Sequence, residues 1–247
     1  LVTGVQTCAL PIFCRDRGYQ GIVICLADYF KGYQIQQRGN GYAMVSVKAG
    51  TSNQQFSDAC ISQGLSGFEF ASGIPGSVGG AVAMNAGAYD GEMRQIVQRV
   101  RLLDPDGHIV SRSCEEMQFG YRHSLVTGTR YVILETVLKL KEADPEAIRL
   151  RVEDLRRQRE EKQPLEYPSC GSTFKRPQGY FAGKLIADAG LKGYQLGGAQ
   201  VSEKHAGFVI NKDHATAADI LNLIRYIQEK VYEQAGVKLE CEVRILG

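Results

Sequence analysis

Before residue 143, the apolar positions of this chain alternate with polar ones in several short segments, which is the period of a half-buried β-strand. "YAMVSVKAG" (42–50) predicts one strand, and "YVILETVLKL" (131–140) predicts a longer one. Between them, "IVQRVRLLDPDGHIVS" (96–111) has two alternating arms joined by a turn with Pro and Gly, the pattern of a β-hairpin. We also expect short strands from "YQGIVICL" (19–26) onward, so this part of the chain should be rich in sheet.

A short helix is expected directly after the first of these strands. Thr51, with Gln54 three residues later, has the spacing of a helix N-cap. Such a helix places Phe56 and Cys60 on one face and stops at Gly64.

Two longer amphipathic helices are expected in the second half of the chain. Asp144 as N-cap and Pro145 at the first helical position begin a strongly charged helix. Thr216 and Asp219 form a capping-box start for the other, which stops at Gly236. The apolar positions with helical spacing are Ile148, Val152 and Leu155 in the first helix and Ile220, Leu223, Ile224, Ile227 and Val231 in the second. "KLECEVRILG" (238–247) predicts a closing strand.

The mixture of strands and helices predicts an α+β fold in two domains. We place them at residues 13–143 and 144–247, because the charged helix marks a change of composition. Residues 1–12, "LVTGVQTCALPI", have no period, no cap and no charged region before an apolar core. They resemble a translated sequencing-adapter fragment, and we expect that they are not natural protein.

Composition and charge exclude several classes of protein. The 247 residues, 44% of them hydrophobic, can bury a sizeable core. A net charge of +2 without a Lys/Arg cluster argues against a nucleic-acid partner, and no apolar run approaches the roughly 20 residues that span a bilayer. The seven cysteines have no C-x-x-C spacing, which indicates reduced cytoplasmic thiols and, with the four scattered histidines, no metal site.

"GIPGSVGGAVAMNAGAYDGE" (73–92) holds six glycines and four alanines. Glycine loses much conformational freedom on folding, so a glycine-rich segment lowers stability. Its glycines are therefore expected where the backbone must approach another group closely. Backbone amides in such a loop can converge on phosphate oxygens without a lysine, but a tight crossing of two segments explains the composition equally well. The spacing matches neither the Rossmann nor the P-loop pattern.

Three further motifs hold candidate chemistry. Arg122 in "FGYRHS" is either a surface residue or a permanent cation for an oxyanion or enolate. Ser172 in "CGSTFKRP" lies outside the G-x-S-x-G context of hydrolases, so it is a turn residue or a proton donor beside cations. Glu240, Glu242 and Arg244 alternate along the closing strand and therefore share a face. They form either a salt bridge or a site in which the arginine orients or tunes a carboxylic acid.

In their order, "SGIPGSVGGAVAMNAGAY", "YRHS", "GSTFKRP", "AGKLIADAGLKG", "HAGFVIN" and "LECEVRILG" resemble the UDP-N-acetylenolpyruvoylglucosamine reductase (MurB) family, over nearly all of residues 18–247. "YPSCGS" is similar to the shorter subtype of that family. The resemblance implies an FAD-binding domain of the vanillyl-alcohol-oxidase (PCMH) type followed by an α+β substrate-binding domain. It implies a monomeric, cytoplasmic enzyme that uses NADPH to reduce a UDP-sugar, UDP-N-acetyl-3-O-(1-carboxyvinyl)-glucosamine, to UDP-N-acetylmuramate for peptidoglycan synthesis.

The same resemblance implies roles for individual residues. Hydride passes from NADPH through the flavin to the terminal enol carbon; Arg122, assisted by Glu242, stabilises the enolate-like charge, and Ser172 supplies the proton. The residues implied at FAD are Gly73, Ile74, Pro75, Gly76, Ser77, Gly79, Gly80, Asn85, Ala86, Gly87 and Ala88. Those implied at the substrate are Tyr121, Lys184, Tyr194 and Asn211. Lys184 can instead cap its own helix, and Tyr194 can fill core.

Two features depart from the family pattern. A first FAD-binding segment, with its own glycine-rich loop and a serine-asparagine pair, is expected before Gly18, where the adapter-like stretch stands. Cys241 takes the place of an expected proline. The alternatives are another FAD-dependent oxidoreductase of the same flavin fold, a non-catalytic UDP-sugar-binding module, or an inactive truncated chain. "GSTFKRP" and the terminal "EVR" together favour the reductase.

Overall fold

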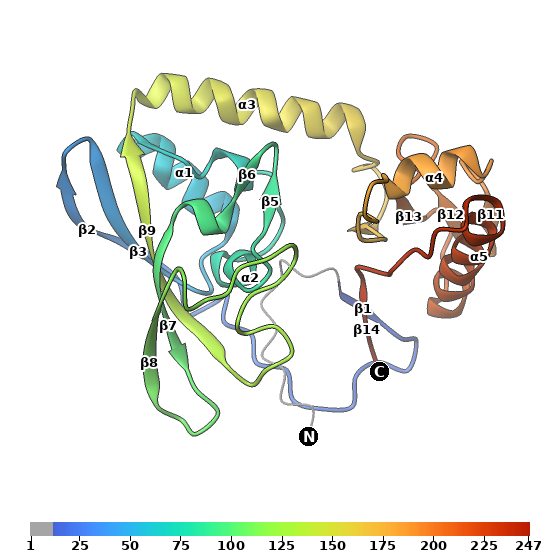
Figure 1. Ribbon diagram of the computed structural model, residues 1–247, viewed down its shortest axis with the longest axis horizontal. Coiled ribbons are helices and arrows are strands. Elements are labelled where there is room, and N and C mark those ends of the chain that lie inside the picture. The colour runs from blue at the N-terminus through green and yellow to red at the C-terminus, as the bar shows by residue number, and fades with distance from the viewer. Residues whose placement is uncertain (1–11) are drawn as a thin grey trace. The chain divides into compact units, whose positions relative to one another are not determined.

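The computed structural model describes residues 12–247, so all of the predicted adapter-like stretch except Ile12 lies outside the described residues. The chain forms two compact units, Gly21–Gln158 and residues 12–20 together with Arg159–Gly247, each with helices and strands (Figure 1). The predicted α+β class is confirmed. The division falls inside helix α3 (Pro145–Lys162), and the domain boundary expected at residue 143 stays a prediction.

The first unit is built on an antiparallel sheet in the order β2-β3-β9-β7-β8, and β4 pairs with the end of β9. Its strands are β2 (Tyr33–Gly39), β3 (Tyr42–Lys48), β4 (Leu65–Ser66), β7 (Val97–Leu103), β8 (Ile109–Ser113) and β9 (Val132–Glu142). In the centre of the sheet, Leu138 of β9 pairs with Val45 of β3, and both side chains are fully buried. The strands expected at β3 and β9 are therefore confirmed, with their apolar positions in the core.

The predicted hairpin is confirmed by β7 and β8, which flank a tight turn. The Asp104 carboxylate accepts hydrogen bonds from the backbone amides of His108 (2.8 Å) and Asp106 (3.0 Å), and these bonds hold its pKa below the ordinary value. Gly107 has a φ of 89°, which explains why a glycine stands in the last position of the turn.

Helix α1 (Asn53–Gln63) begins one residue later than predicted. Its N-cap is Ser52, whose Oγ accepts a hydrogen bond from the Gln55 amide at 3.1 Å. The Thr51 hydroxyl bonds both backbone groups of Gly32 instead, at 2.9 and 3.1 Å, so a contact with an earlier loop removes it from the helix. The helix ends at Gly64 as predicted, in the left-handed conformation.

The strand expected at residues 19–26 is wrong. This segment has no regular structure, and Ile22, Val23 and Ile24 are exposed. An apolar run becomes a strand only where another strand supplies backbone partners. Residues 19–26 have no such neighbour within the described part of the chain.

The long charged helix is confirmed by α3, which begins at Pro145 as expected. Its three predicted apolar positions, Ile148, Val152 and Leu155, are all buried. The exposed side carries ion pairs at helical spacing, such as Arg149 with Glu153.

The second unit has an antiparallel sheet in the order β10-β13-β12-β11. Its strands are β10 (Ser169–Ser172), β11 (Gln195–Leu196), β12 (Ala199–Val201) and β13 (Phe208–Asn211), and its helices are α4 (Ala182–Asp188) and α5 (Ala217–Ala235). Helix α5 packs on this sheet. The predicted capping box of Thr216 and Asp219 and the stop at Gly236 are confirmed, and Leu223, Ile227 and Val231 are fully buried.

The closing strand is shorter than predicted. Only Arg244–Leu246 form a strand, β14, which pairs in parallel with β1 (Ile12–Cys14). Cys241 instead makes an isolated bridge with Phe174, and the backbone of Glu240 bonds that of Lys175. The segment changes partner between its two halves, so it cannot continue as one strand.

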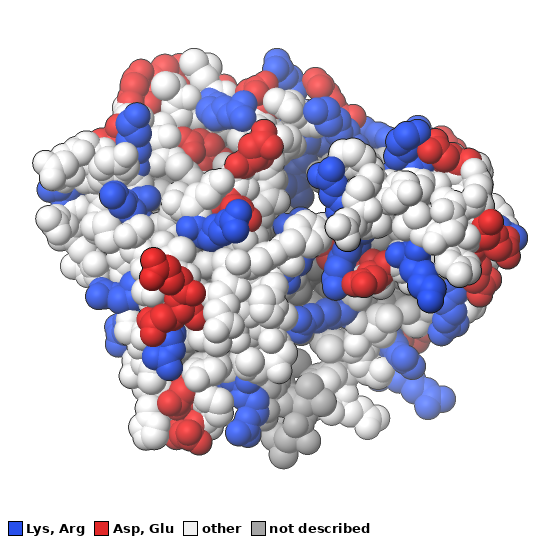
Figure 2. Space-filling view, viewed as in Figure 1, with Lys and Arg blue, Asp and Glu red and all other residues white. Residues whose placement is uncertain are grey.

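None of the described helices has the length and apolar character needed to cross a lipid bilayer. Acidic and basic side chains are interspersed on the face drawn in Figure 2, in keeping with a net charge of +2.

Candidate active site

The glycine-rich segment consists of a loop at 73–77, helix α2 (Val78–Ala83) and a small hairpin of β5 (Gly87–Ala88) and β6 (Gly91–Glu92). Ser77 caps α2 by accepting a hydrogen bond from the Gly80 amide at 3.3 Å. Ser77 through Val82 are buried, whereas the loop residues before Ser77 and the residues of β5 are at least partly exposed. The part of this segment that is open to a ligand therefore includes Gly73, Ile74, Pro75, Gly76, Gly87 and Ala88, and contacts of Ser77, Gly79 and Gly80 with FAD stay predictions.

Two of these glycines are explained by packing within the protein. A Cβ on Gly79 would lie 2.6 Å from the Ala49 Cβ, and one on Gly91 would lie 2.6 Å from the Phe70 ring. Gly76 has a φ of 115° and lies in the exposed loop. The tight crossing and the exposed backbone, which the composition left as alternatives, occur in different parts of the same segment.

Asn53 is a buried residue beside this loop that the sequence did not single out. Its amide nitrogen Nδ2 donates to the Ile74 carbonyl at 3.1 Å, and its backbone amide donates to the Gly76 carbonyl at 2.9 Å. The Asn53 side chain is fully buried, yet its Oδ1 has no hydrogen-bond partner in the described part of the chain. A buried acceptor without a donor is rare and costly, so this oxygen fits a site that a ligand completes.

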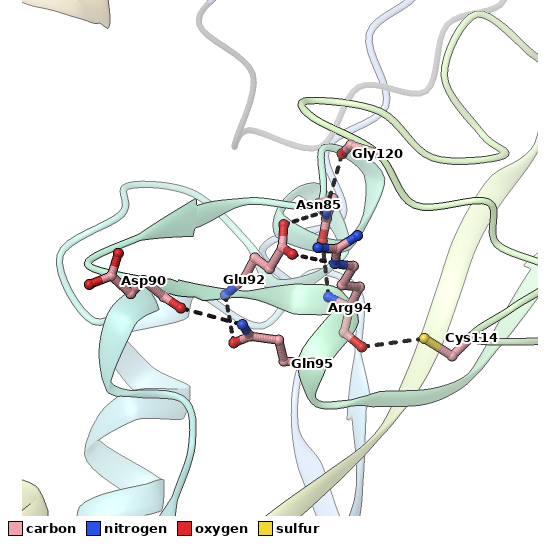
Figure 3. Close-up of polar contacts among 7 residues, drawn as sticks. All are labelled: Asn85, Asp90, Glu92, Arg94, Gln95, Cys114 and Gly120. Carbon is pink, nitrogen blue, oxygen red and sulfur yellow. Dashed lines mark hydrogen bonds and ion pairs between the residues drawn. The ribbon is translucent and has the colours of Figure 1, made fainter. Parts of the chain in front are cut away.

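Asn85 lies just past the other end of α2, where its side chain points toward Glu92, Arg94 and Gly120 (Figure 3). It is 2% exposed, and its Nδ2 donates to Glu92 Oε2 at 2.9 Å and to the Gly120 carbonyl at 3.1 Å. Its Oδ1 accepts from the Arg94 amide at 2.9 Å. All these partners are protein groups, and a contact of Asn85 or of the buried Ala86 with FAD stays a prediction.

Arg122 occupies the second corner of a two-residue turn. The turn is closed by hydrogen bonds between the backbones of Gly120 and His123, at 3.0 and 3.3 Å. Arg122 has a φ of 53°, the left-handed region, and its guanidinium lies over the exposed Tyr121 ring, 5.2 Å from the centroid. Arg122 and the glycine-rich segment belong to the same unit and are joined through the hydrogen bond from Asn85 to Gly120.

Ser172 is exposed at the end of β10 in the second unit. Its Oγ donates to the Phe174 carbonyl at 3.2 Å. The preceding Gly171 has a φ of 77° and lies within a register irregularity between β10 and β13. Such a bulge redirects the side chains that follow it, which accounts for the glycine before this serine. The neighbouring cation Lys175 pairs with Glu240 at 3.0 Å.

Glu242 lies on the segment that pairs with the residues after Ser172. Its backbone amide donates to the Thr173 carbonyl at 2.8 Å, and the Lys175 amide donates to the Glu240 carbonyl at 2.9 Å. Glu242 is half-buried. The structure therefore places Ser172 and Glu242 on adjoining segments of the second unit, although 70 residues separate them in sequence.

Two of the predicted substrate contacts are engaged within the second unit. Lys184 pairs with Asp188 on α4 at 2.9 Å, an ion pair at i,i+4 spacing and not the helix cap that the sequence offered as its alternative role. The Tyr194 ring stacks on Tyr226 with centroids 4.7 Å apart and is 37% exposed. A hydrogen bond with Tyr226 raises the pKa of the Tyr194 hydroxyl. Their roles at the substrate stay predictions.

Asn211, at the end of β13, lines an apolar cavity of about 220 Å³. Its Oδ1 accepts from the Ala215 amide at 2.8 Å and so closes the turn before α5. Other residues that line this cavity are Phe13, Cys170, Thr173, Ile224 and Val243.

The profile of the "FAD binding domain" matches residues 12–113, so the chain is a flavoprotein of two units. The profile described as "UDP-N-acetylenolpyruvoylglucosamine reductase, C-terminal domain" matches residues 163–246. The chain belongs to the UDP-N-acetylenolpyruvoylglucosamine reductase (MurB) family, as its motifs predicted.

Relatives of that name support the assignment. The reductase of Limosilactobacillus fermentum is 50% identical over 239 residues, which are 97% of this chain and 78% of that protein. That of Clostridium perfringens is 49% identical over 236 residues, 96% of this chain and 76% of the relative. The fold also matches the crystal structure of UDP-N-acetylenolpyruvylglucosamine reductase (MurB) from Thermus caldophilus with a TM-score of 0.80. The two sequences are 36% identical, and the match covers 94% of this chain and 81% of that one.

Proposed function

We propose that this chain is an FAD-dependent reductase that uses NADPH to convert UDP-N-acetyl-3-O-(1-carboxyvinyl)-glucosamine to UDP-N-acetylmuramate, a precursor of peptidoglycan. The observation that carries the proposal is 50% identity over 97% of the chain with a protein named for this activity. Arg122, Ser172 and Glu242 stand at the motif positions where the resemblance expects them.

The first unit has a segment suited to FAD. The exposed backbone of residues 73–76 allows a cofactor to approach Gly73 and Gly76 without meeting any side-chain atom there, and the orphaned Asn53 Oδ1 offers an acceptor beside the loop. We assign the holding of FAD to this loop and to Gly87 and Ala88. When bound, FAD supplies two-electron hydride chemistry between NADPH and the substrate.

The polar residues then complete the reduction. The double bond of the substrate gains a hydride at one carbon and a proton at the other. Arg122 stays charged at any working pH and can hold the substrate carboxylate and the negative charge that develops beside it, with Glu242 assisting. The Ser172 hydroxyl gives up its bond to the Phe174 carbonyl and donates the proton, and its exposure lets water restore that proton.

Ser172→Ala tests the proton donor. Steady-state oxidation of NADPH by the FAD-loaded variant should be about 10²–10⁴-fold slower than that of the wild type, because general-acid catalysis is lost. Binding of substrate and of FAD should be unchanged, since the serine side chain holds neither.

Ser169→Ala is the matched control, because Ser169 is another exposed serine of β10. It should leave turnover at the wild-type rate. A Ser172→Ala chain with wild-type turnover would refute the assignment of the proton donor. A wild-type chain, saturated with FAD, that fails to oxidise NADPH with the enolpyruvyl substrate would refute the proposed function itself.

We further propose that the enzyme acts as a single chain in the cytoplasm. Six cysteines among the described residues are free thiols, which fits a reducing compartment. The UDP-sugar substrate is a small molecule and requires no second protein.

A further inference from the structure

The turn that carries Arg122 is fixed to the end of helix α2 by buried polar side chains on both sides of the arginine. We infer that Asn85 and Ser124 are positioning residues, which set the backbone of this turn and thereby the place of the Arg122 guanidinium. The inference rests on the role of Arg122 in the proposed function and adds two residues to it.

Asn85 holds the first strand of the turn. The Nδ2 of this buried side chain donates to the Gly120 carbonyl at 3.1 Å, two residues before Arg122 (Figure 3). The other two bonds of the Asn85 amide, to Glu92 and to the Arg94 backbone, fix the amide itself. Because Arg94 and Glu92 also form an ion pair with each other, the Asn85 side chain is held from two directions.

Ser124 holds the second strand of the turn. Ser124 is two residues after Arg122, and its side chain is fully buried. Its Oγ donates to the Ala83 carbonyl at 2.6 Å. Thr127 also donates to the Ala83 carbonyl at 3.4 Å and accepts from the Ser124 amide at 3.0 Å. The turn is therefore attached on one side to Asn85 and on the other to Ala83, the last residue of α2.

The turn needs such support because its own conformation is disfavoured. Arg122 has a left-handed φ of 53°, a region that residues with a side chain avoid. Tyr121 beside it is 58% exposed. The attachments to Ala83 and Asn85 lie on the buried side, so they stabilise this backbone against an extended one.

The chemistry of position 85 favours asparagine. Asn85 has a φ of 42°, a conformation that asparagine tolerates better than most residues, and it must donate twice and accept once. An ionised aspartate could still accept from the Arg94 amide but could not donate to Gly120. It would also place a second carboxylate beside that of Glu92.

Asn85→Gly isolates the side chain, because glycine keeps the left-handed backbone without strain. In the FAD-loaded chain, we expect kcat to fall about 10–100-fold, the size of effect that a small misplacement of a catalytic group produces. In an Arg122→Ala background, the same substitution should cause no further fall in kcat, because residues that act through one group are not additive.

Three further variants keep the result interpretable. Ser124→Ala should lower kcat through the same turn, so the inference does not depend on one variant that folds. Gln95→Ala removes a neighbour in the same network, bonded to Glu92 and Asp90 but not to Asn85, and should leave kcat unchanged. Val100→Ala removes buried side-chain volume from β7, away from the turn. It is the control for a general loss of stability that leaves the turn intact.

Amide hydrogen exchange of the chain without FAD provides a second readout. Asn85→Gly should speed exchange at Gly120 and His123, whose amides close the turn, while Val100→Ala should not do so selectively. Unchanged exchange there, wild-type kcat in Asn85→Gly, or an equal fall in kcat with and without Arg122 would each overturn the inference. Wild-type kcat in Arg122→Ala alone would count against the proposed function, and the exchange experiment would still decide whether Asn85 orders the turn.

Discussion

At the scale of single residues, the imidazole of His205 ties the stability of the second unit to pH. Its Nδ1 accepts a hydrogen bond from the Gly207 amide at 3.1 Å, which requires the unprotonated nitrogen. Burial lowers the pKa of His205 below its ordinary 6.5, and the nearby Lys192 lowers it further. The folded state thus binds this proton less readily than the unfolded chain.

The linkage has a definite sign. Well above pH 6.5 the imidazole is neutral in both states, so the free energy of unfolding has its full value there. As the pH falls below that value, the unfolded chain takes up the proton first, and the free energy of unfolding decreases until the folded imidazole is also protonated. Urea unfolding at pH 7.5 and 5.5 should therefore show a larger loss for the wild type than for His205→Gln; equal losses would contradict the prediction.

Motif residues could be located from the sequence, but their surroundings could not. Arg122 and Ser172 were singled out by residue type and spacing, whereas Asn53 carries no local signal of its orphaned oxygen. The same holds for Asn85, which the resemblance placed at FAD. Its hydrogen bond to Gly120 spans 35 residues, and only the folded chain brings the two together.

At the scale of elements, helix α2 depends on a glycine where it crosses Ala49, the residue after β3. The Gly79 amide donates to the Ala49 carbonyl at 2.9 Å, and a Cβ on Gly79 would lie 2.6 Å from the Ala49 Cβ. Gly79→Ala should therefore lower the free energy of unfolding by about 1–3 kcal/mol through overpacking, even without FAD.

Chemical denaturation of the chain without cofactor measures this effect. Val82→Ala on the same helix is a useful comparison, because it removes buried volume instead of adding it. A Gly79→Ala chain as stable as the wild type would mean that this glycine serves only the ligand.

Elements with local signals were predicted, and those held by tertiary contacts were not. Helices α3 and α5 have caps and apolar stripes within their own sequence, and both were expected at the right place. Helix α2 has six residues, two of them glycine, and was missed because its contacts with β3 and β9 hold it. At Thr51 and Ser52, two adjacent hydroxyls could each cap α1, and the contact of Thr51 with Gly32 decided between them.

At the scale of the whole molecule, each of the two units has a core of its own. A ligand that binds one unit in its folded state stabilises that unit by mass action. At an FAD concentration 100 times its Kd, the first unit should gain about 2.7 kcal/mol. Calorimetry should show its unfolding transition moving up by several degrees, with the transition of the second unit in place. A thermogram that FAD does not change would refute the assignment of the cofactor to this chain.

The pairing of β1 with β14 also sets an order of events during synthesis on the ribosome. Phe13 of β1 pairs with Ile245 of β14, about 230 residues later, so β1 must wait for β14 to emerge before the two can pair. At roughly 5–20 residues per second the delay is about 10–50 s. The whole of Gly21–Gln158 leaves the ribosome within that time and can fold first. The second unit thus forms its β1–β14 pair only after the first unit has had time to fold.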